Sequence, residues 1–393
     1  MPCREPPQRP SGYDLRMDTA LQTLADRVRA AAAAQTPLRI RGGGTKDFHG
    51  QGLQGEVLDM GAITGIVAYE PSELVITVRA GTPLAEVEAA LASRGQSLAF
   101  EPPRFGPGGT VGGMVAAGWS GPARASVGAV RDYVLGLSLI NGRGEELTFG
   151  GQVMKNVAGY DVSRLMAGAW GTLGVITEVS LKVLPVAPAE ATLRFDCSQA
   201  DALQRLNAWG GQPLPLNASC WVHEDGAAHP AAHGVGTLYV RLRGAAAAVE
   251  TACQRMGGTR LDNATVAPDW SACRDQQLPW FTQRPADLAL WRLSVPQTAP
   301  VLDLSAGVGA PLIEWHGGLR WVQAPRSAGA ALDAAARAVG GSASLFVAAG
   351  AQPESAGDDF SLNSTALDEV HRRLKQAFDP AGILNRGRMS ARW

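Results

Sequence analysis

The most informative parts of this sequence are Arg-Gly-Gly-Gly-Thr-Lys at residues 41–46 and Gly-Thr-Val-Gly-Gly-Met-Val-Ala-Ala-Gly at residues 109–118. A diphosphate needs several converging backbone N–H donors, which glycine permits because it accepts positive φ and has no Cβ. Arg41, Lys46 and the Thr45 hydroxyl flank the first glycine run, which favours an anion over a bare turn. Each stretch alone also fits a structural role, the first as a tight turn and the second as close helix–sheet packing.

The spacing of these glycines excludes two common nucleotide loops. The pattern G-x-x-x-x-G-K-[ST] is absent, and no G-x-G-x-x-G opens a helix after the first expected strand. ATP and NAD sites of those types are therefore not predicted.

Hydrophobic patterning predicts a first unit of alternating strands and helices. A helix over residues 19–34 ends before Pro37, and a short strand at 38–40 feeds the first glycine run. We expect further strands at residues 57–59, 66–70, 74–78, 134–140, 146–149 and 175–184. One helix is expected to begin at Pro83, and another is expected over residues 160–166.

From residue 190 onward the pattern changes to strand, helix, two strands and helix, which predicts an antiparallel sheet backed by helices. The polar stretch at 351–359 is expected to be a loop that returns to the first unit, before a last helix at 367–378. The expected later strands of the second unit are 289–295, 311–315, 319–323 and 344–348, with a helix at 327–339.

Composition narrows the classes of partner. The formal net charge is −1, from 35 basic and 36 acidic residues, so no overall field attracts nucleic acid or anionic lipid. Five scattered cysteines form no C-x-x-C pair and six histidines show no zinc-type spacing, so we expect no metal and a reduced, cytoplasmic setting. The sequence contains no run of eighteen apolar residues, so no membrane span is predicted.

Four motifs together carry a family resemblance. They are the two glycine stretches, residues 155–185 (from K-N-V-A-G-Y-D to L-K-V-L-P) and the tail F-D-P-A-G-I-L-N-R-G-R-M at 378–389. The first three resemble the FAD domain of the vanillyl-alcohol oxidase and p-cresol methylhydroxylase superfamily. From Met17 to Met389, the chain resembles the FAD-binding subunit of bacterial glycolate oxidase.

The resemblance implies an α+β fold. It consists of a two-subdomain, p-cresol methylhydroxylase-type FAD-binding domain at residues 17–187 and a smaller antiparallel α+β cap domain at 188–350. Residues 351–393 are expected to pack back on the FAD-binding domain. Because Pro2, Pro6, Pro7 and Pro10 crowd the start of the chain, we expect residues 1–16 to form a disordered extension.

The resemblance also implies which residues contact FAD. The first loop would cradle the diphosphate, the second would line its other side, the segment after residue 170 would pass near the adenosine and flavin, and the tail would close over the cofactor. The implied contacts are Arg41, Gly42, Gly43, Gly44, Thr45, Lys46, Gly108, Gly109, Thr110, Val111, Gly112, Gly113, Ala117, Gly118, Gly171, Gly174, Ile176 and Asn385. No histidine stands in the first loop and His49 lies further on, so we expect non-covalent FAD.

The implied activity is oxidation of glycolate, with D-lactate left open, by a complex containing a sister flavin-binding catalytic subunit and an iron–sulfur subunit. Such a complex would bring this cytoplasmic chain to the inner face of the membrane without inserting it. A stand-alone FAD-dependent 2-hydroxy-acid dehydrogenase and a non-catalytic flavin subunit are the alternatives. The H-x-G-D-G-N signature of related dehydrogenases is absent, which favours a subunit over an autonomous enzyme.

No catalytic residue is identified. The nearest candidates are His316 and Arg320, together with Lys155, Tyr160 and Asp161, and an ordinary structural role is the favoured interpretation of each. Asp161 is expected to cap the helix that begins near residue 162. We also expect a partner-binding apolar patch on the second unit, where tryptophans 280, 291, 315 and 321 are concentrated.

Overall fold

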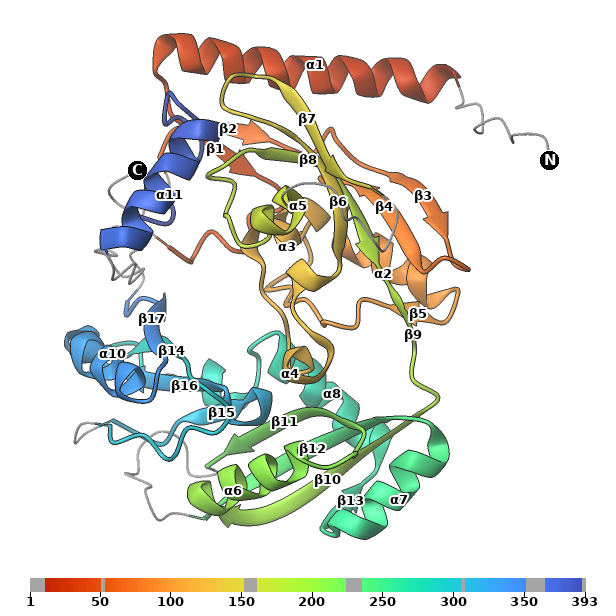
Figure 1. Ribbon diagram of the computed structural model, residues 1–393, viewed down its shortest axis with the longest axis vertical. Coiled ribbons are helices and arrows are strands. Elements are labelled where there is room, and N and C mark those ends of the chain that lie inside the picture. Colours follow the sequence, from red (N-terminus) through yellow and green to blue (C-terminus); the bar gives the residue numbers. More distant parts are fainter. Residues whose placement is uncertain are drawn as a thin grey trace.

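The computed structural model describes residues 11–50, 54–151, 161–223, 235–304, 308–350 and 365–390. Two sheets stand one above the other in Figure 1, each with its own helices. We call the part that contains the upper sheet the first unit and the part that contains the lower sheet the second unit. Strand β9 (Leu184–Pro185) ends the first and β10 (Ala189–Ser198) begins the second, so we propose the division at residue 187.

The described part of the first unit contains one larger sheet and two small two-stranded sheets. Strands β1 (Leu38–Arg41) and β2 (Glu56–Asp59) form a parallel pair, and the larger antiparallel sheet has the order β3-β4-β8-β6-β7. Val75, Ile76 and Val78 are all buried in β4, so both faces of this β-branched strand are covered. The larger sheet comprises β3 (Ile66–Glu70), β4 (Val75–Arg79), β6 (Val134–Ile140), β7 (Glu146–Gly150) and β8 (Val175–Lys182), and β5 (Gln96–Ser97) pairs with β9.

Helices of the first unit cover these sheets. The longest is α1 (Ser11–Ala34), which lies across the top in Figure 1 and buries Val28 in the core. The others are α2 (Leu84–Ala92), α3 (Val111–Ala117), α4 (Arg124–Val127), α5 (Val162–Met166) and the short 3-10 helix at Val130–Asp132.

The second unit is an eight-stranded, wholly antiparallel sheet with the order β13-β10-β12-β11-β15-β16-β14-β17, as the predicted fold class requires. Its strands are β10, β11 (Leu216–Val222), β12 (Val235–Gly244), β13 (Thr259–Leu261), β14 (Ala289–Ser294), β15 (Leu312–Glu314), β16 (Leu319–Ala324) and β17 (Ser342–Val347). Its α-helices are α6 (Gln199–Gly210), α7 (Ala246–Met256), α8 (Asn263–Arg274), α9 (Pro279–Thr282) and α10 (Gly329–Ala338), and its 3-10 turns are Trp315–Gly317 and Arg326–Ala328.

The described part of the C-terminal segment, residues 365–390, packs against the first unit. Helix α11 (Thr365–Phe378) lies beside β1 and β2 in Figure 1, whereas β17 lies in the second unit. The Lys375 ammonium is buried and donates to the Asp379 carboxylate at 2.7 Å and to the carbonyl oxygens of Thr172 and Leu384. The Leu38 amide donates to the Ile383 carbonyl at 2.7 Å, which extends β1 by one bridge to the tail.

Two expectations were wrong. The first helix begins at Ser11, so residues 11–16 are helical; the prolines that suggested disorder all precede Ser11, and residues 1–10 lie outside the described residues. The four tryptophans are not a surface patch, because each is at most 6% exposed and belongs to the core of the second unit. Asp161 does cap α5, accepting a hydrogen bond from the Arg164 amide at 3.1 Å.

Candidate functional site

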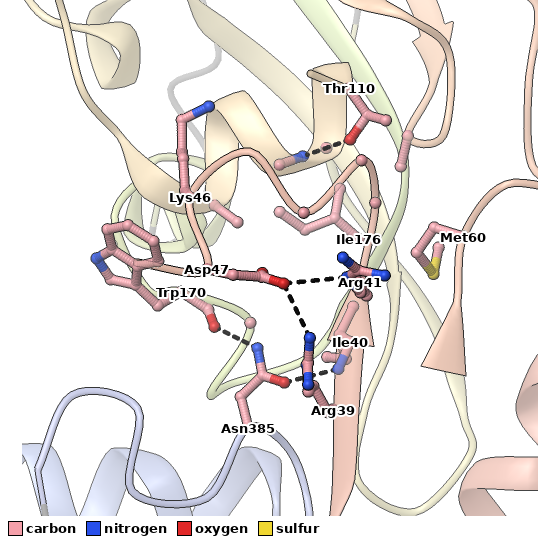
Figure 2. Close-up of a pocket in the computed structure, with 18 of the residues that line it drawn as sticks. Arg39, Ile40, Arg41, Lys46, Asp47, Met60, Thr110, Trp170, Ile176 and Asn385 are labelled. Atoms are coloured by element: carbon pink, nitrogen blue, oxygen red, sulfur yellow. Dashed lines mark hydrogen bonds and ion pairs between the residues drawn. The ribbon is translucent and has the colours of Figure 1, made fainter. Parts of the chain in front are cut away.

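A hollow of about 800 Å³, partly open to solvent, lies where the two glycine loops meet the returning tail. Figure 2 shows it between β1, the loop after β1, the start of α3 and the tail. The residues that line it are Arg39, Ile40, Arg41, Gly42, Gly43, Gly44, Thr45, Lys46, Asp47, Met60, Ala80, Thr110, Gly112, Gly113, Ala116, Trp170, Gly171, Gly174, Ile176, Asn385 and Arg388.

Close backbone packing explains why glycines form this wall. A Cβ on Gly43 would lie 1.4 Å from the Gly108 carbonyl oxygen, and a Cβ on Gly112 would lie 2.7 Å from the Ala80 side chain. Gly44 has a φ of +70°, a region that other residues rarely adopt. The two loops therefore touch through bare backbone, and peptide groups form this part of the wall of the hollow.

The second loop is fixed by a helix cap. Thr110 precedes α3, and its hydroxyl accepts a hydrogen bond from the Gly113 amide at 3.2 Å. The Leu84 amide donates to the Gly109 carbonyl, and the Gly112 amide donates to the Ala80 carbonyl. The loop thus stays in one conformation against the first.

An ion-pair network stands at the rim of the hollow. Asp47 Oδ2 accepts from Arg39 Nη2 at 2.8 Å and from Arg41 Nε at 3.1 Å, and Figure 2 shows the carboxylate between the two guanidinium groups. One carboxylate facing two guanidinium groups leaves a net positive rim, which suits a polyanion.

Two cationic residues of the lining are buried, and the ammonium of one of them, Lys46, lies 5.8 Å from the centre of the Phe105 ring. Lys46 is 8% exposed, and burial lowers the pKa of its ammonium to about 8. Arg388 donates through Nη2 to the Lys46 carbonyl at 2.7 Å, and its guanidinium carbon lies 4.9 Å from the centre of the Trp170 ring. Among the described residues, the buried Nη1 of Arg388 has no hydrogen-bond partner, so this donor is available to a ligand.

Asn385 holds three segments together. Its Oδ1 accepts from the Ile40 amide at 2.7 Å, and its Nδ2 donates to the Trp170 carbonyl at 2.6 Å, as Figure 2 shows. A Cβ on Gly171 would lie 2.7 Å from that same Nδ2. The amide of Asn385 therefore closes the tail over the hollow and is already occupied by protein partners.

Most of the residues that the sequence predicted at the site do meet here. Thirteen line the hollow: all six of the first loop, together with Thr110, Gly112, Gly113, Gly171, Gly174, Ile176 and Asn385.

The structure places the other five away from the hollow. Val111 and Ala117 point into the core, Gly108 backs onto Gly43, Gly109 is bonded through its carbonyl to α2, and Gly118 ends α3 with a φ of +66°. Within α3, helical periodicity turns Val111 and Ala117 inward, which the glycine pattern alone does not reveal.

The histidine nearest to the first loop is part of an aromatic core. His49 Nδ1 lies 3.0 Å from the Phe346 carbonyl oxygen, and its ring stacks on Trp170 at 5.0 Å between centroids. Burial lowers the pKa of His49 to about 3, so the ring is neutral at physiological pH. His49 does not line the hollow, and non-covalent cofactor binding stays a prediction.

The expected second-unit candidates have structural partners. His316 Nε2 lies 3.0 Å from Ser126 Oγ and its Nδ1 lies 3.0 Å from Ser219 Oγ, while burial lowers its pKa to about 4. The Arg320 guanidinium donates to the carbonyl oxygens of Ala299 and Pro300 at 2.7 and 2.6 Å. Lys155 and Tyr160 lie outside the described residues. Within the described ranges, no cluster of three or more His, Cys, Asp or Glu could hold a metal ion.

Comparison with known proteins supports these observations. Residues 19–150 match the family model "FAD binding domain". The chain is 43% identical to the glycolate oxidase subunit GlcE of Escherichia coli over 94% of its own length and 97% of that protein. It is 33% identical to the glycolate oxidase subunit GlcD of Bacillus subtilis over 40% of its own length and 34% of that protein.

Solved structures support the fold. Alkyldihydroxyacetonephosphate synthase aligns with a TM-score of 0.62 and 17% identity, over 92% of this chain and 74% of the other. In the part of the chain that the structure describes, no helix is both long and apolar enough to cross a membrane.

Proposed function

Because this chain belongs to the family of the glycolate oxidase subunit GlcE, we propose that it holds FAD in the hollow and serves as the FAD-binding subunit of a glycolate oxidase complex. The observation that carries the proposal is the wall of bare glycine backbone in a hollow that buried cationic residues also line. Peptide N–H groups without Cβ atoms in front of them suit a diphosphate, which is the charged part of FAD.

The residues present fit this cofactor by charge as well as by shape. Arg388 offers its unpartnered Nη1, Lys46 is a buried ammonium, and Arg41 supplies a rim charge. Residues 42–46 and 110–113 would hold the diphosphate, while Gly171, Gly174 and Ile176 would face the less polar parts of the molecule. Bound FAD supplies a two-electron acceptor. We expect it to be held without a covalent bond.

We propose glycolate as the substrate of the complex, with D-lactate as a second possibility that a substrate comparison decides. A sister flavin-binding subunit and an iron–sulfur subunit are the proposed partners, supported by the word "subunit" in the names of both glycolate oxidase relatives. In this proposal the sister subunit oxidises glycolate. The flavin of this chain receives electrons and holds them or passes them on. Through these partners, a cytoplasmic chain would work at the inner face of the membrane.

The test separates this proposal from its two alternatives. The chain is purified alone, its flavin spectrum is recorded, and glycolate is added without air. We expect a yellow chain that bleaches only after the sister subunit is added. Bleaching without any partner would instead establish a stand-alone dehydrogenase. A flavin that never bleaches, even in the assembled complex, would establish a structural flavin subunit. A colourless chain that refuses added FAD would refute the cofactor site itself.

A further inference from the structure

A second cavity lies between the two units, next to the hollow. Its volume is about 440 Å³, and it is partly open to solvent. Residues 118–121, which follow α3, form one wall, and the sheet of the second unit forms another. Trp119 lines this cavity and contacts Trp170, which lines the hollow, with 4.9 Å between ring centroids. Each of the two spaces therefore has one ring of this indole pair in its wall.

The sheet turns two charged side chains toward this cavity. Arg292 of β14 pairs with Trp321 of β16, and Trp321 pairs with Leu312 of β15. Directly paired residues share a face, and so do residues two apart in a strand, so Glu314 lies on the same face as Arg292. Arg320, next to Trp321, is on the opposite face. A carboxyl group and a guanidinium group therefore stand on the wall that the sheet forms, where the other lining side chains are apolar.

Arg292 interacts with the Glu314 carboxyl only at a distance, through the attraction between the two charges. Within the described ranges, its guanidinium makes no ion pair, and its central carbon lies 5.1 Å from the centre of the Trp315 ring. A second guanidinium, that of Arg124 from the first unit, lies 4.4 Å from the same ring. Burial and the charge of Arg124 lower the pKa of Arg292 to about 10, which still leaves it protonated at physiological pH. Glu314 and Asp132 act on these two cations from a distance, but no direct ion pair is formed with Arg292 within the described ranges, so the guanidinium groups on this indole ring favour an anion.

Glu314 is held beside this positive charge but is not paired with it. Its Oε1 accepts a hydrogen bond from the Trp321 indole at 3.0 Å, and its side chain is buried. Burial raises the pKa of the Glu314 carboxyl to about 7. Such a group can donate or accept a hydrogen bond near neutral pH, as a hydroxyl group requires.

We propose that this cavity binds a small 2-hydroxy carboxylate, with the carboxylate of the ligand on Arg292 and its hydroxyl group hydrogen-bonded to Glu314. The aromatic walls, which include Phe105, Trp119 and Phe346, restrict the ligand to a short carbon chain. The choice of a hydroxy acid rests on the proposed function, whereas the anion site rests on the cavity itself. Neither Arg292 nor Glu314 lines the cofactor hollow, so loss of one site leaves the other measurable.

The test measures ligand binding and not turnover. The full chain without added FAD is titrated with glycolate, acetate and glycolamide, followed by calorimetry and by the fluorescence of the tryptophans that line the cavity. We expect glycolate to bind most tightly, acetate more weakly because it lacks the hydroxyl group, and glycolamide not at all because it lacks the charge. FAD binding is measured separately by absorbance.

Variants assign the roles. Arg292→Gln should weaken glycolate and acetate alike by about ten- to a hundredfold, the usual worth of a charge-assisted hydrogen bond. Arg292→Lys should recover part of that loss. Glu314→Leu, which leaves no hydrogen-bonding group at that position, should remove the preference for glycolate over acetate without weakening acetate. Arg255→Gln, the same change at an exposed position of α7, should alter neither affinity.

Three outcomes would overturn the inference. The first is a wild-type chain that takes up FAD but shows no saturable binding of glycolate. The second is an Arg292→Gln variant that keeps wild-type affinity. The third applies if Arg292→Gln fails to fold: an Arg292→Lys chain, folded by near-ultraviolet circular dichroism, that binds acetamide as well as acetate would show that charge plays no part. A chain that binds glycolate but refuses FAD would refute the proposed function and leave this inference standing.

Discussion

Replacing Gly43 by alanine tests the contact between the two glycine loops. The new Cβ would lie 1.4 Å from the Gly108 carbonyl oxygen and 2.3 Å from the carbonyl carbon, both of them backbone atoms. The loops must then separate by more than 1 Å to restore a normal contact, which opens the wall of the hollow. Forcing an extra methyl group into a packed site typically costs about 1–3 kcal/mol.

The assay combines stability with cofactor affinity. For a unit of this size, each kcal/mol lowers the melting temperature by about 2–4 °C, so Gly43→Ala should melt about 2–12 °C below the wild type. We also expect it to lose FAD, measured by absorbance after gel filtration. Gly109→Ala is the matched control in the facing loop, because its Cβ would meet only ordinary contacts, the nearest at 3.6 Å. A Gly43→Ala chain that keeps its flavin and melts with the control would refute the reasoning.

Three further predictions concern buried charges. Arg388→Gln removes the guanidinium whose Nη1 has no partner in the described structure, and it should weaken FAD binding about tenfold or more at unchanged secondary structure, as measured by fluorescence titration. Lys375→Met leaves the Asp379 carboxylate buried and should cost about 3–5 kcal/mol in denaturant melts; a loss under 1 kcal/mol would contradict the proposed docking of the tail. The raised pKa of Glu314 makes the folded state less stable as pH rises from about 4.5 to about 7. Glu314→Gln should remove a pH-dependent loss of roughly 3 kcal/mol between pH 5 and 8, and an unchanged pH slope would count against it.

The cofactor loops could be predicted from the sequence because their signal is local. Glycines, basic residues and a hydroxyl group close together in the chain describe a phosphate-binding backbone without reference to the fold. Arg388 was not predicted as a site residue, although it stands in the quoted tail, because its ability to bind an anion depends on its burial beside Lys46 and Trp170. Long-range contacts of this kind leave no mark in the spacing of residues.

The second cavity was missed for a related reason. Arg292 and Glu314 each interrupt an apolar strand, which is a visible signal, but only the order of strands shows that β15 and β14 flank β16 with their charges on one face. The tryptophans were placed on the surface because their number suggested a partner, yet the wide sheet needs them as core. Helix α8 was not expected either, because Pro268 stands inside it.

The return of the tail sets an order of events during synthesis. Asn385 bonds to Ile40 across 345 residues, and Arg388 bonds to Lys46 across 342. On the ribosome, the glycine loops emerge long before residues 385–388 and face an unfinished site until that segment has been made. We therefore expect cofactor loading to wait for residues 385–388, and a chain that stops before residue 385 would carry both glycine loops without the tail that closes over the hollow.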